Sequence, residues 1–305
     1  MTENEIKEEY EKTLIKDLEL KPQVRLSPSS INEYLRCPRC YFYRYIAKLP
    51  TPPNVHLIKG IVVHTVLENF FKSYKPDIDS NMIDLFNKAW KSHEKGIKDL
   101  ELSPEDETQA KNDCLIILTE YIETFKRRMN NLIQSGKAEN NTHAYHLLKP
   151  KFREKFYYDE DLHCCGFVDR IQEDFNGLVT IGDYKTSSKF GIGLPGNYKL
   201  QLAIYSLLYK LKEQKMPDFA AVIFLRYGEE YIIEVTPSLL QYALTTIQDV
   251  WAKTRSTAIE DYPPNEGESS RWCPFLDIHD GTDEWKKKVR TERIKDMIKE
   301  TEKEL

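Results

Sequence analysis

The stretch from Gly166 to Tyr205 decides the fold of this chain. It contains three pieces: GFVDRI at 166–171, LVTIGDYKTSSKF at 178–190 and NYKLQLAIYSLL at 197–208. The second piece begins with β-forming side chains, so we expect a strand that ends near Asp183 and Lys185. Because side chains two positions apart on a strand share a face, this strand presents a carboxylate and an ammonium side by side.

Asp169 lies on the strand before, and the Asn176-Gly177 dipeptide between the two strands is typical of a hairpin turn. Asp169 can therefore reach the same point as Asp183 and Lys185 from the neighbouring strand. Carboxylates are hard oxygen ligands that suit Mg²⁺ or Mn²⁺. A lysine beside them can hold or activate a water molecule and offset the negative charge that grows on a phosphate.

Four short elements follow one another along the chain in a fixed order. They are Gly60-x-x-x-His64, Gly166-x-x-Asp169, Asp183-x-Lys185 and Gln201-x-x-x-Tyr205. The last three resemble the core of the PD-(D/E)XK nucleases. The glutamine–tyrosine element and the upstream histidine are similar to the RecB-type branch, which includes CRISPR-adaptation nucleases and the nuclease domains of bacterial recombination helicases. The resemblance covers roughly Leu26 to Pro274.

This resemblance implies an α/β fold with a restriction-endonuclease-like core, in which helices flank a central mixed sheet. We expect helices, three strands, a helix, two strands and a closing helix along the chain. The predicted parts are a charged N-terminal helix at 1–23, the nuclease domain at 24–283 and a charged C-terminal helix at 284–305. Within the nuclease domain, residues at about 77–148 have a helical pattern and are predicted to form an insertion.

The resemblance also implies roles for individual residues. The catalytic residues would be Asp169, Asp183, Lys185, Gln201 and Tyr205. The ligands of Mg²⁺ or Mn²⁺ would be His64, Asp169, Asp183 and the backbone carbonyl of Tyr184. In the family the glutamine is thought to steady the lysine, the metal-bound water or the DNA backbone. Without the family, a single histidine on a helix is more often a hydrogen-bonded structural residue than a ligand.

Residues 151–158, KFREKFYY, alternate in the manner of a strand. On a strict alternation Glu154 shares a face with Phe152 and Phe156, where a charge is costly unless it is paired. Glu154 is therefore a candidate for a third acidic group at the site. The alternative is an exposed strand end.

The chain has six cysteines, and in a protein without an export signal a disulfide framework is not expected. Many RecB-type nucleases hold an iron–sulfur cluster through one cysteine near the N-terminus and three near the C-terminus. Here Cys37 and Cys273 match that pattern, and Cys40 and His279 complete a Cys₃His set. Such a set suits a structural Zn²⁺, with an iron–sulfur cluster or ordinary buried thiols as alternatives.

Composition limits the partners. The net charge of −5 argues against a nonspecific coat on nucleic acid, so any contact with DNA must be a local basic groove. The basic run at 126–128 either faces DNA or is a solvated helix end.

No run of residues is long and apolar enough for a bilayer and the first residues are acidic, so we expect a cytoplasmic protein with no membrane partner. A P-loop is absent from the sequence, so a helicase motor would be a separate partner.

The sequence thus predicts a divalent-metal-dependent DNA nuclease, an exonuclease more than an endonuclease. It would hydrolyse phosphodiester bonds in DNA repair, recombination, or viral or CRISPR DNA processing. Its partners would be single- or double-stranded DNA ends and a helicase or recombination protein. One alternative is a catalytically silent nuclease-fold module that binds DNA or a partner. Another is a structural salt bridge between the acidic pair and Lys185, which requires a paired and inaccessible Lys185.

Overall fold

A computed structural model describes residues 12–16, 18–51, 54–187, 193–265, 273–275 and 278. The chain divides into two compact units. One is formed within 1–53, 160–164 and 245–305, and the other within 54–159 and 165–244. The predicted helix at 284–305 lies outside the described residues, and of the predicted helix at 1–23 the described part is helical at 12–15.

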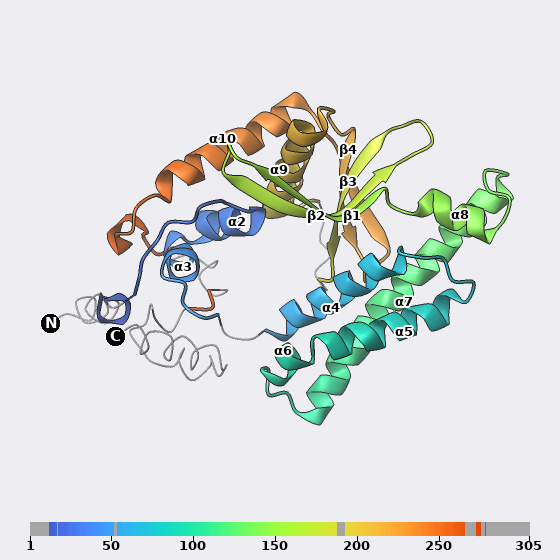
Figure 1. Ribbon diagram of the computed structural model, residues 1–305, viewed down its shortest axis with the longest axis horizontal. Coiled ribbons are helices and arrows are strands. Elements are labelled where there is room, and N and C mark those ends of the chain that lie inside the picture. The colour runs from blue at the N-terminus through green and yellow to red at the C-terminus, as the bar shows by residue number, and fades with distance from the viewer. Residues whose placement is uncertain are drawn as a thin grey trace. The chain divides into compact units, whose positions relative to one another are not determined.

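A five-stranded mixed sheet lies at the centre of the second unit (Figure 1). Its strands are β1 (Phe152–Asp159), β2 (Cys164–Glu173), β3 (Val179–Lys185), β4 (Phe219–Phe224) and β5 (Glu229–Glu234), in the order β1-β2-β3-β4-β5. Strands β2 and β3 are antiparallel, β3 and β4 are parallel, and β4 and β5 are antiparallel. The predicted order of elements and the mixed sheet are confirmed.

Glycines give the β2–β3 and β4–β5 turns their backbone conformation. Gly177 in the β2–β3 turn has φ +77°, and Gly228 in the β4–β5 turn has φ +63°. Both values lie in the left-handed region that other residues rarely adopt, so each glycine supplies the conformation that the turn requires. The Asp174 carboxylate accepts hydrogen bonds from the backbone N–H groups of Asn176 and Leu178, which fixes the first turn.

Helix α9 (Gly196–Glu213) joins the parallel strands β3 and β4 and packs against one face of the sheet. On the other face the ring of Tyr184 meets Tyr121 and His64 edge-on, with centroids 6.1 Å and 6.0 Å away. Tyr121 belongs to α7 (Pro104–Gln134) and His64 to α4 (Val55–Phe70). The sheet is therefore a middle layer, with α9 on one side and α4 and α7 on the other (Figure 1).

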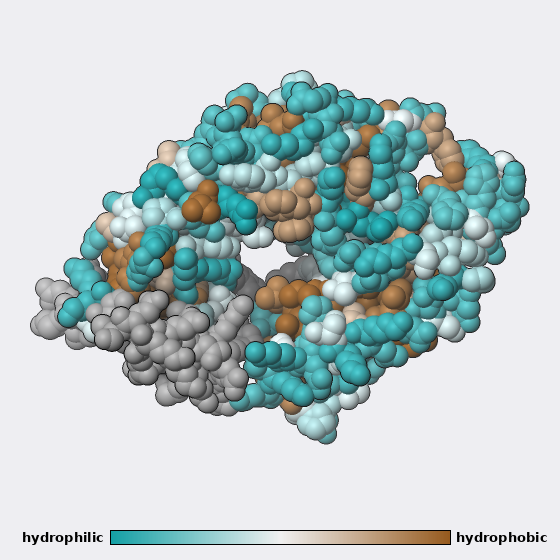
Figure 2. Space-filling model, in the orientation of Figure 1, coloured by the Kyte–Doolittle hydropathy of each residue, from teal (hydrophilic) through white to brown (hydrophobic). Residues whose placement is uncertain are grey.

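Most of the predicted insertion is helical. It consists of α5 (Ile78–Ser92), α6 (Glu94–Lys98), α7 and α8 (Asn141–Leu148). Helices α4, α5 and α7 lie side by side, and aromatic rings fill the space between them, including Phe70, Phe71, Phe125 and Tyr145 (Figure 1). The outer surfaces of these helices carry mainly hydrophilic residues (Figure 2). This apolar core continues onto the sheet, because Tyr184 and Ile223 belong to it.

The first unit contains α2 (Pro28–Arg36), α3 (Pro38–Tyr41), a π-helical turn (Phe42–Ile46) and a 3₁₀ turn (Ile259–Asp261). Helix α10 (Pro237–Lys253) begins in the other unit and ends in this one. Ser27 caps α2, and its reciprocal partner in the capping box is Ser30, three residues on. Glu33 forms ion pairs with Arg36 and Arg44.

Candidate active site

An imidazole and two carboxylates meet beside the sheet. His64 Nδ1 lies 3.5 Å from Asp169 Oδ1 and 3.6 Å from Glu154 Oε1. One ligand atom from each residue lies within 4.8 Å of the others. Asp169 is buried, whereas the side chains of His64 and Glu154 are 28% and 30% exposed. These three side chains form the acidic cluster, which solvent can reach.

Glu154 reaches the acidic cluster because β1 carries an extra residue. The Lys151 N–H donates to the Ile171 carbonyl, and the Phe156 ring lies against Phe167. Five steps on β1 therefore span four steps on β2, which is the count of a β-bulge. Glu154 has φ +46° and is the bulged residue. The strict alternation predicted for 151–158 is thus wrong, and the bulge turns Glu154 towards His64.

The second group of polar side chains is the lysine network of Asp183, Lys185, Gln201 and Tyr205. Lys185 Nζ lies 2.7 Å from Asp183 Oδ2 and donates to Gln201 Oε1 at 2.9 Å. Gln201 Nε2 donates to Asp183 Oδ1 at 2.9 Å and to the Tyr205 hydroxyl at 3.0 Å. The amide of Gln201 therefore holds both members of the ion pair, one through its oxygen and the other through its nitrogen.

Asp169 connects the acidic cluster to the lysine network. Its Oδ1 faces His64, and its Oδ2 accepts a hydrogen bond of 2.7 Å from the backbone N–H of Tyr184. The Asp183 carboxylate turns to Lys185 and Gln201 and is not one of the three groups within 4.8 Å of one another. The structure thus brings Glu154 close to His64 and Asp169, whereas the sequence favoured Asp183 in that position.

The site has a strong negative potential. Burial lowers the pKa of His64, but the charge of Asp169 and hydrogen bonds to Asp169 and Glu154 outweigh this effect and raise it to about 10. Burial raises the pKa of Asp183 above its usual range, Lys185 opposes this shift, and the charge of Asp169 adds to it. Burial lowers the pKa of Lys185, but attraction to Asp183 raises it overall. Lys185 is therefore a cation at neutral pH.

Glycine is required where α9 meets β2. A Cβ added at Gly166 would lie 2.7 Å from Tyr205 Cε1 and 3.1 Å from Tyr205 Cδ1. The first residue of the Gly166-x-x-Asp169 element therefore lets the Tyr205 ring pack onto the strand. The ring is buried and holds Gln201 through its hydroxyl. This packing joins two of the sequence elements in space.

The cysteine set differs from its prediction. Cys40 and Cys273 form a disulfide with a Cα–Cα distance of 6.2 Å, within the usual range for such a bond. The expectation that this chain would hold no disulfide is therefore corrected. The buried Cys37 Sγ accepts a hydrogen bond from the Cys40 N–H. His279 lies outside the described residues. The three cysteines thus lie together, and the metal assignment stays a prediction.

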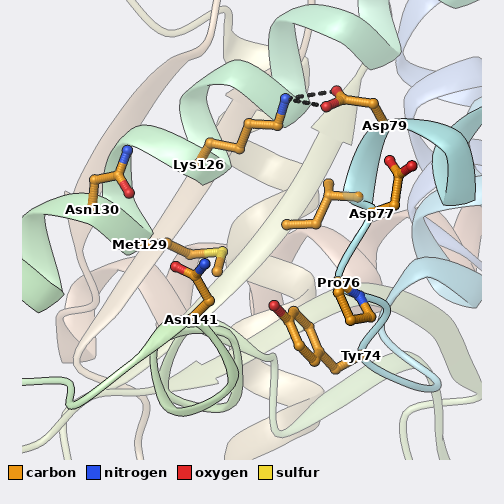
Figure 3. A pocket seen from close by; sticks show the side chains of 9 residues that line it. Tyr74, Pro76, Asp77, Asp79, Lys126, Met129, Asn130 and Asn141 are labelled. Atoms are coloured by element: carbon orange, nitrogen blue, oxygen red, sulfur yellow. Dashed lines mark hydrogen bonds and ion pairs between the residues drawn. The ribbon is translucent and has the colours of Figure 1, made fainter.

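The basic run at 126–128 is engaged within the protein. Lys126 Nζ lies 2.6 Å from both carboxylate oxygens of Asp79 (Figure 3). Arg128 donates to Glu230 at 2.8 Å. Lys126 lines a pocket of about 260 Å³ with Asp77, Asp79 and Asn141, to which the acidic cluster and the lysine network contribute nothing. Helix α7 continues to Gln134, so the predicted helix end at this run is wrong. The ion pairs nevertheless disfavour the alternative that the run faces DNA.

A mixed sheet with an acid–lysine pair at the end of one strand, and a crossover helix that holds the pair, defines an α/β protein of the nuclease class. The family pattern of the PD-(D/E)XK nuclease superfamily matches residues 25–278. The chain therefore belongs to this superfamily and has its restriction-endonuclease-like core. A search of curated proteins found no match.

Among solved structures, one similar chain is a protein from Eubacterium rectale described as a putative exonuclease. It has 13% sequence identity and a TM-score of 0.43, and the alignment covers 79% of this chain and 84% of that one. Across the described residues, helices are too short or too polar to cross a membrane.

Proposed function

We propose that the protein is a divalent-metal-dependent deoxyribonuclease that hydrolyses phosphodiester bonds, with DNA ends as its substrate. The observation that carries this proposal is the position of the lysine network beside the acidic cluster, where Asp169 binds the backbone N–H of Tyr184 between Asp183 and Lys185. Metal ligands and a cation for the phosphate are thereby available at one place. The acidic cluster is accessible, which a substrate as large as DNA requires.

The donor atoms fit Mg²⁺ or Mn²⁺. Carboxylate oxygens from Glu154 and Asp169 are hard ligands, and the His64 imidazole is a ligand that Mn²⁺ accepts. Asp183 and the carbonyl of Tyr184 would complete the set from β3. A bound divalent cation lowers the pKa of its water and neutralises charge on the phosphate oxygens.

Lys185 has the role of a charge stabiliser. Because attraction to Asp183 raises its pKa, the ammonium is protonated at neutral pH and is not a base. Its charge opposes the negative charge that develops on the phosphate, and its N–H groups position the attacking water. Gln201 fixes the direction of the ammonium, and Tyr205 fixes Gln201. Gln201 and Tyr205 are therefore positioning residues for Lys185.

The finer predictions are part of the same proposal. We infer that ends are cut more readily than internal bonds, and that the protein acts in the cytoplasm with a helicase or recombination protein in repair, recombination, or viral or CRISPR DNA processing. Cys37, Cys40, Cys273 and His279 are proposed to hold Zn²⁺, or an iron–sulfur cluster, when the Cys40–Cys273 disulfide is reduced. The colour and metal content of reduced protein test this second site.

Cleavage assays test the proposal. Purified protein is incubated with end-labelled and circular DNA, each single- and double-stranded, in Mg²⁺, Mn²⁺ or EDTA. We expect cleavage with either metal, none in EDTA, and a preference for linear DNA. Asp183→Ala and Lys185→Ala should abolish cleavage. Asp249→Ala and Lys253→Ala, which break an exposed ion pair on α10, are the matched controls and should cut normally. Full cleavage by Asp183→Ala or Lys185→Ala would refute the mechanism.

The salt-bridge alternative has one observation in its favour, the 2.7 Å distance between Lys185 and Asp183. A purely structural pair predicts that Lys185→Ala lowers the free energy of unfolding and that wild-type protein cuts nothing. The silent-module alternative predicts DNA binding without cleavage by wild-type protein in any metal. Equilibrium unfolding and DNA binding, measured beside the cleavage assay, therefore separate the three functions.

A further inference from the structure

Two exposed phenylalanines lie next to the acidic cluster on β1 and β2. Phe156 is 41% exposed and Phe167 is 56% exposed. Their ring centroids are 4.8 Å apart, and the ring planes are tilted by 45°. These two residues form the aromatic pair. Large apolar side chains that remain exposed beside polar groups often mark a site of interaction.

The aromatic pair lies on the sheet face opposite α9. Gly166 faces Tyr205 of α9, so the side chain of the next residue, Phe167, points to the other face. His64 of α4 lies on that other face, and Asp169 Oδ1 faces the His64 imidazole. Two residues along a strand span about 6.6 Å, so the exposed ring is next to the carboxylate.

Strand β1 repeats the arrangement. Phe156 follows Glu154 by two residues, whereas Phe167 precedes Asp169 by two residues. The two strands run in opposite directions, because Lys151 meets Ile171 and Phe156 meets Phe167. Each strand therefore contributes one acidic group to the cluster and one exposed ring on the same side of it. Any chain that leaves the acidic cluster in that direction passes over the aromatic pair.

We propose that the aromatic pair is a stacking platform for an unpaired nucleobase beside the scissile phosphate, so that the site takes single-stranded DNA or frayed duplex ends. This inference rests on the proposed nuclease function and names the form of its substrate. Exposed aromatic rings bind bases of any sequence through their π-faces, and the bases of an intact duplex are already stacked on one another.

Binding is measured first, in EDTA, so that the result does not depend on cleavage. The probes are a fluorescein-labelled oligo(dT), the same length of strand with abasic sites, and a blunt duplex. Wild-type protein should bind oligo(dT) roughly ten- to a hundredfold more tightly than the abasic strand, because stacking is lost with the base. The variant Phe156→Ala/Phe167→Ala should bind both strands equally, with the affinity that wild-type protein has for the abasic strand.

The chain offers a matched control. Phe175 is 61% exposed and lies beyond the other end of β2, in the β2–β3 turn. Phe175→Ala removes another exposed phenylalanine ring and leaves the aromatic pair intact, so this variant should bind DNA like wild-type protein. Because a cross-strand aromatic pair also stabilises its strands, thermal unfolding of each variant is recorded first.

The outcomes separate this inference from the proposed function. Wild-type protein that binds oligo(dT) and the abasic strand equally overturns the inference, and this comparison needs no variant. Unchanged DNA binding by the double variant also overturns the inference. If light scattering then shows that the double variant has an altered oligomeric state, the aromatic pair is assigned to a protein contact. A wild-type protein that prefers oligo(dT) but cuts no DNA in Mg²⁺ or Mn²⁺ refutes the nuclease function while the stacking result stands.

Discussion

The contact between Gly166 and Tyr205 gives a quantitative test of how the strand and the crossover helix fit together. In Gly166→Ala the new Cβ would lie 2.7 Å from Tyr205 Cε1, well inside the 3.4–4 Å of an ordinary contact. The ring has little freedom to retreat, because it is 6% exposed and its hydroxyl accepts a hydrogen bond from Gln201. Overpacking of a filled core costs about 1–3 kcal/mol, and we expect Gly166→Ala to lose that much of its free energy of unfolding.

A double-mutant cycle isolates this contact. Tyr205→Leu removes the ring atoms that the new methyl group would meet, so Gly166→Ala should cost less than about 0.5 kcal/mol in that background. The assay is urea unfolding followed by circular dichroism, with all four proteins under the same conditions. Cleavage is measured in parallel, because a displaced Tyr205 releases Gln201 and with it the orientation of Lys185. Gly166→Ala should therefore lower kcat as well as stability.

Gly196→Ala is the control for the effect of the substitution itself. A Cβ at Gly196 meets no atom within 4 Å, and alanine favours the start of α9, so we expect unchanged or slightly higher stability. An equal cost of Gly166→Ala with and without the Tyr205 ring would refute the reasoning. In that case the strand, and not the ring, would require glycine.

Three further predictions follow from single contacts. Glu230→Gln leaves the largely buried Arg170, whose side chain is 14% exposed, without its anion and should cost about 3–5 kcal/mol at pH 7. Burial raises the pKa of Glu230, but Arg170 above all lowers it below 4.5. In urea unfolding the difference from wild type should therefore persist above pH 4.5 and shrink below it. Gln201→Ala should lower kcat roughly ten- to a hundredfold in a cleavage assay with saturating Mn²⁺, and an unchanged kcat would remove its positioning role. Gly228→Ala forces a side chain to φ +63° and to 2.6 Å from Thr124 Oγ1, and a loss smaller than about 1 kcal/mol in thermal unfolding would contradict this clash.

Local signals made much of the fold predictable. The β-forming residues before Asp183 and the Asn176-Gly177 turn each act within a few residues, and the structure has both where the sequence predicts them. Residues that share a face of a strand or a helix also follow from periodicity alone. Lys185 and Gln201 meet because a crossover helix must pack back onto the strand that precedes it.

The remaining features depend on contacts between distant parts of the chain. The bulge at Glu154 leaves no trace in the alternation of residues 151–158, because only the pairing with β2 reveals an extra residue. The aromatic pair is not predictable from the sequence for the same reason, since only the strand register brings Phe156 and Phe167 together. The Cys40–Cys273 disulfide joins positions 233 residues apart, and spacing alone does not predict which cysteines meet.

The electrostatics of the site argue that the Asp183–Lys185 pair is more than a structural salt bridge. In a balanced pair the cation lowers the pKa of its carboxylate, but burial and Asp169 raise the pKa of Asp183 despite Lys185. The same carboxylates raise the pKa of His64 to about 10. The site therefore favours a second positive charge, on His64, besides the charge of Lys185. Three acidic groups with one ammonium leave a deficit of positive charge. A proton on His64 and a divalent cation are alternative ways to supply that charge, and both place a positive charge between Glu154 and Asp169.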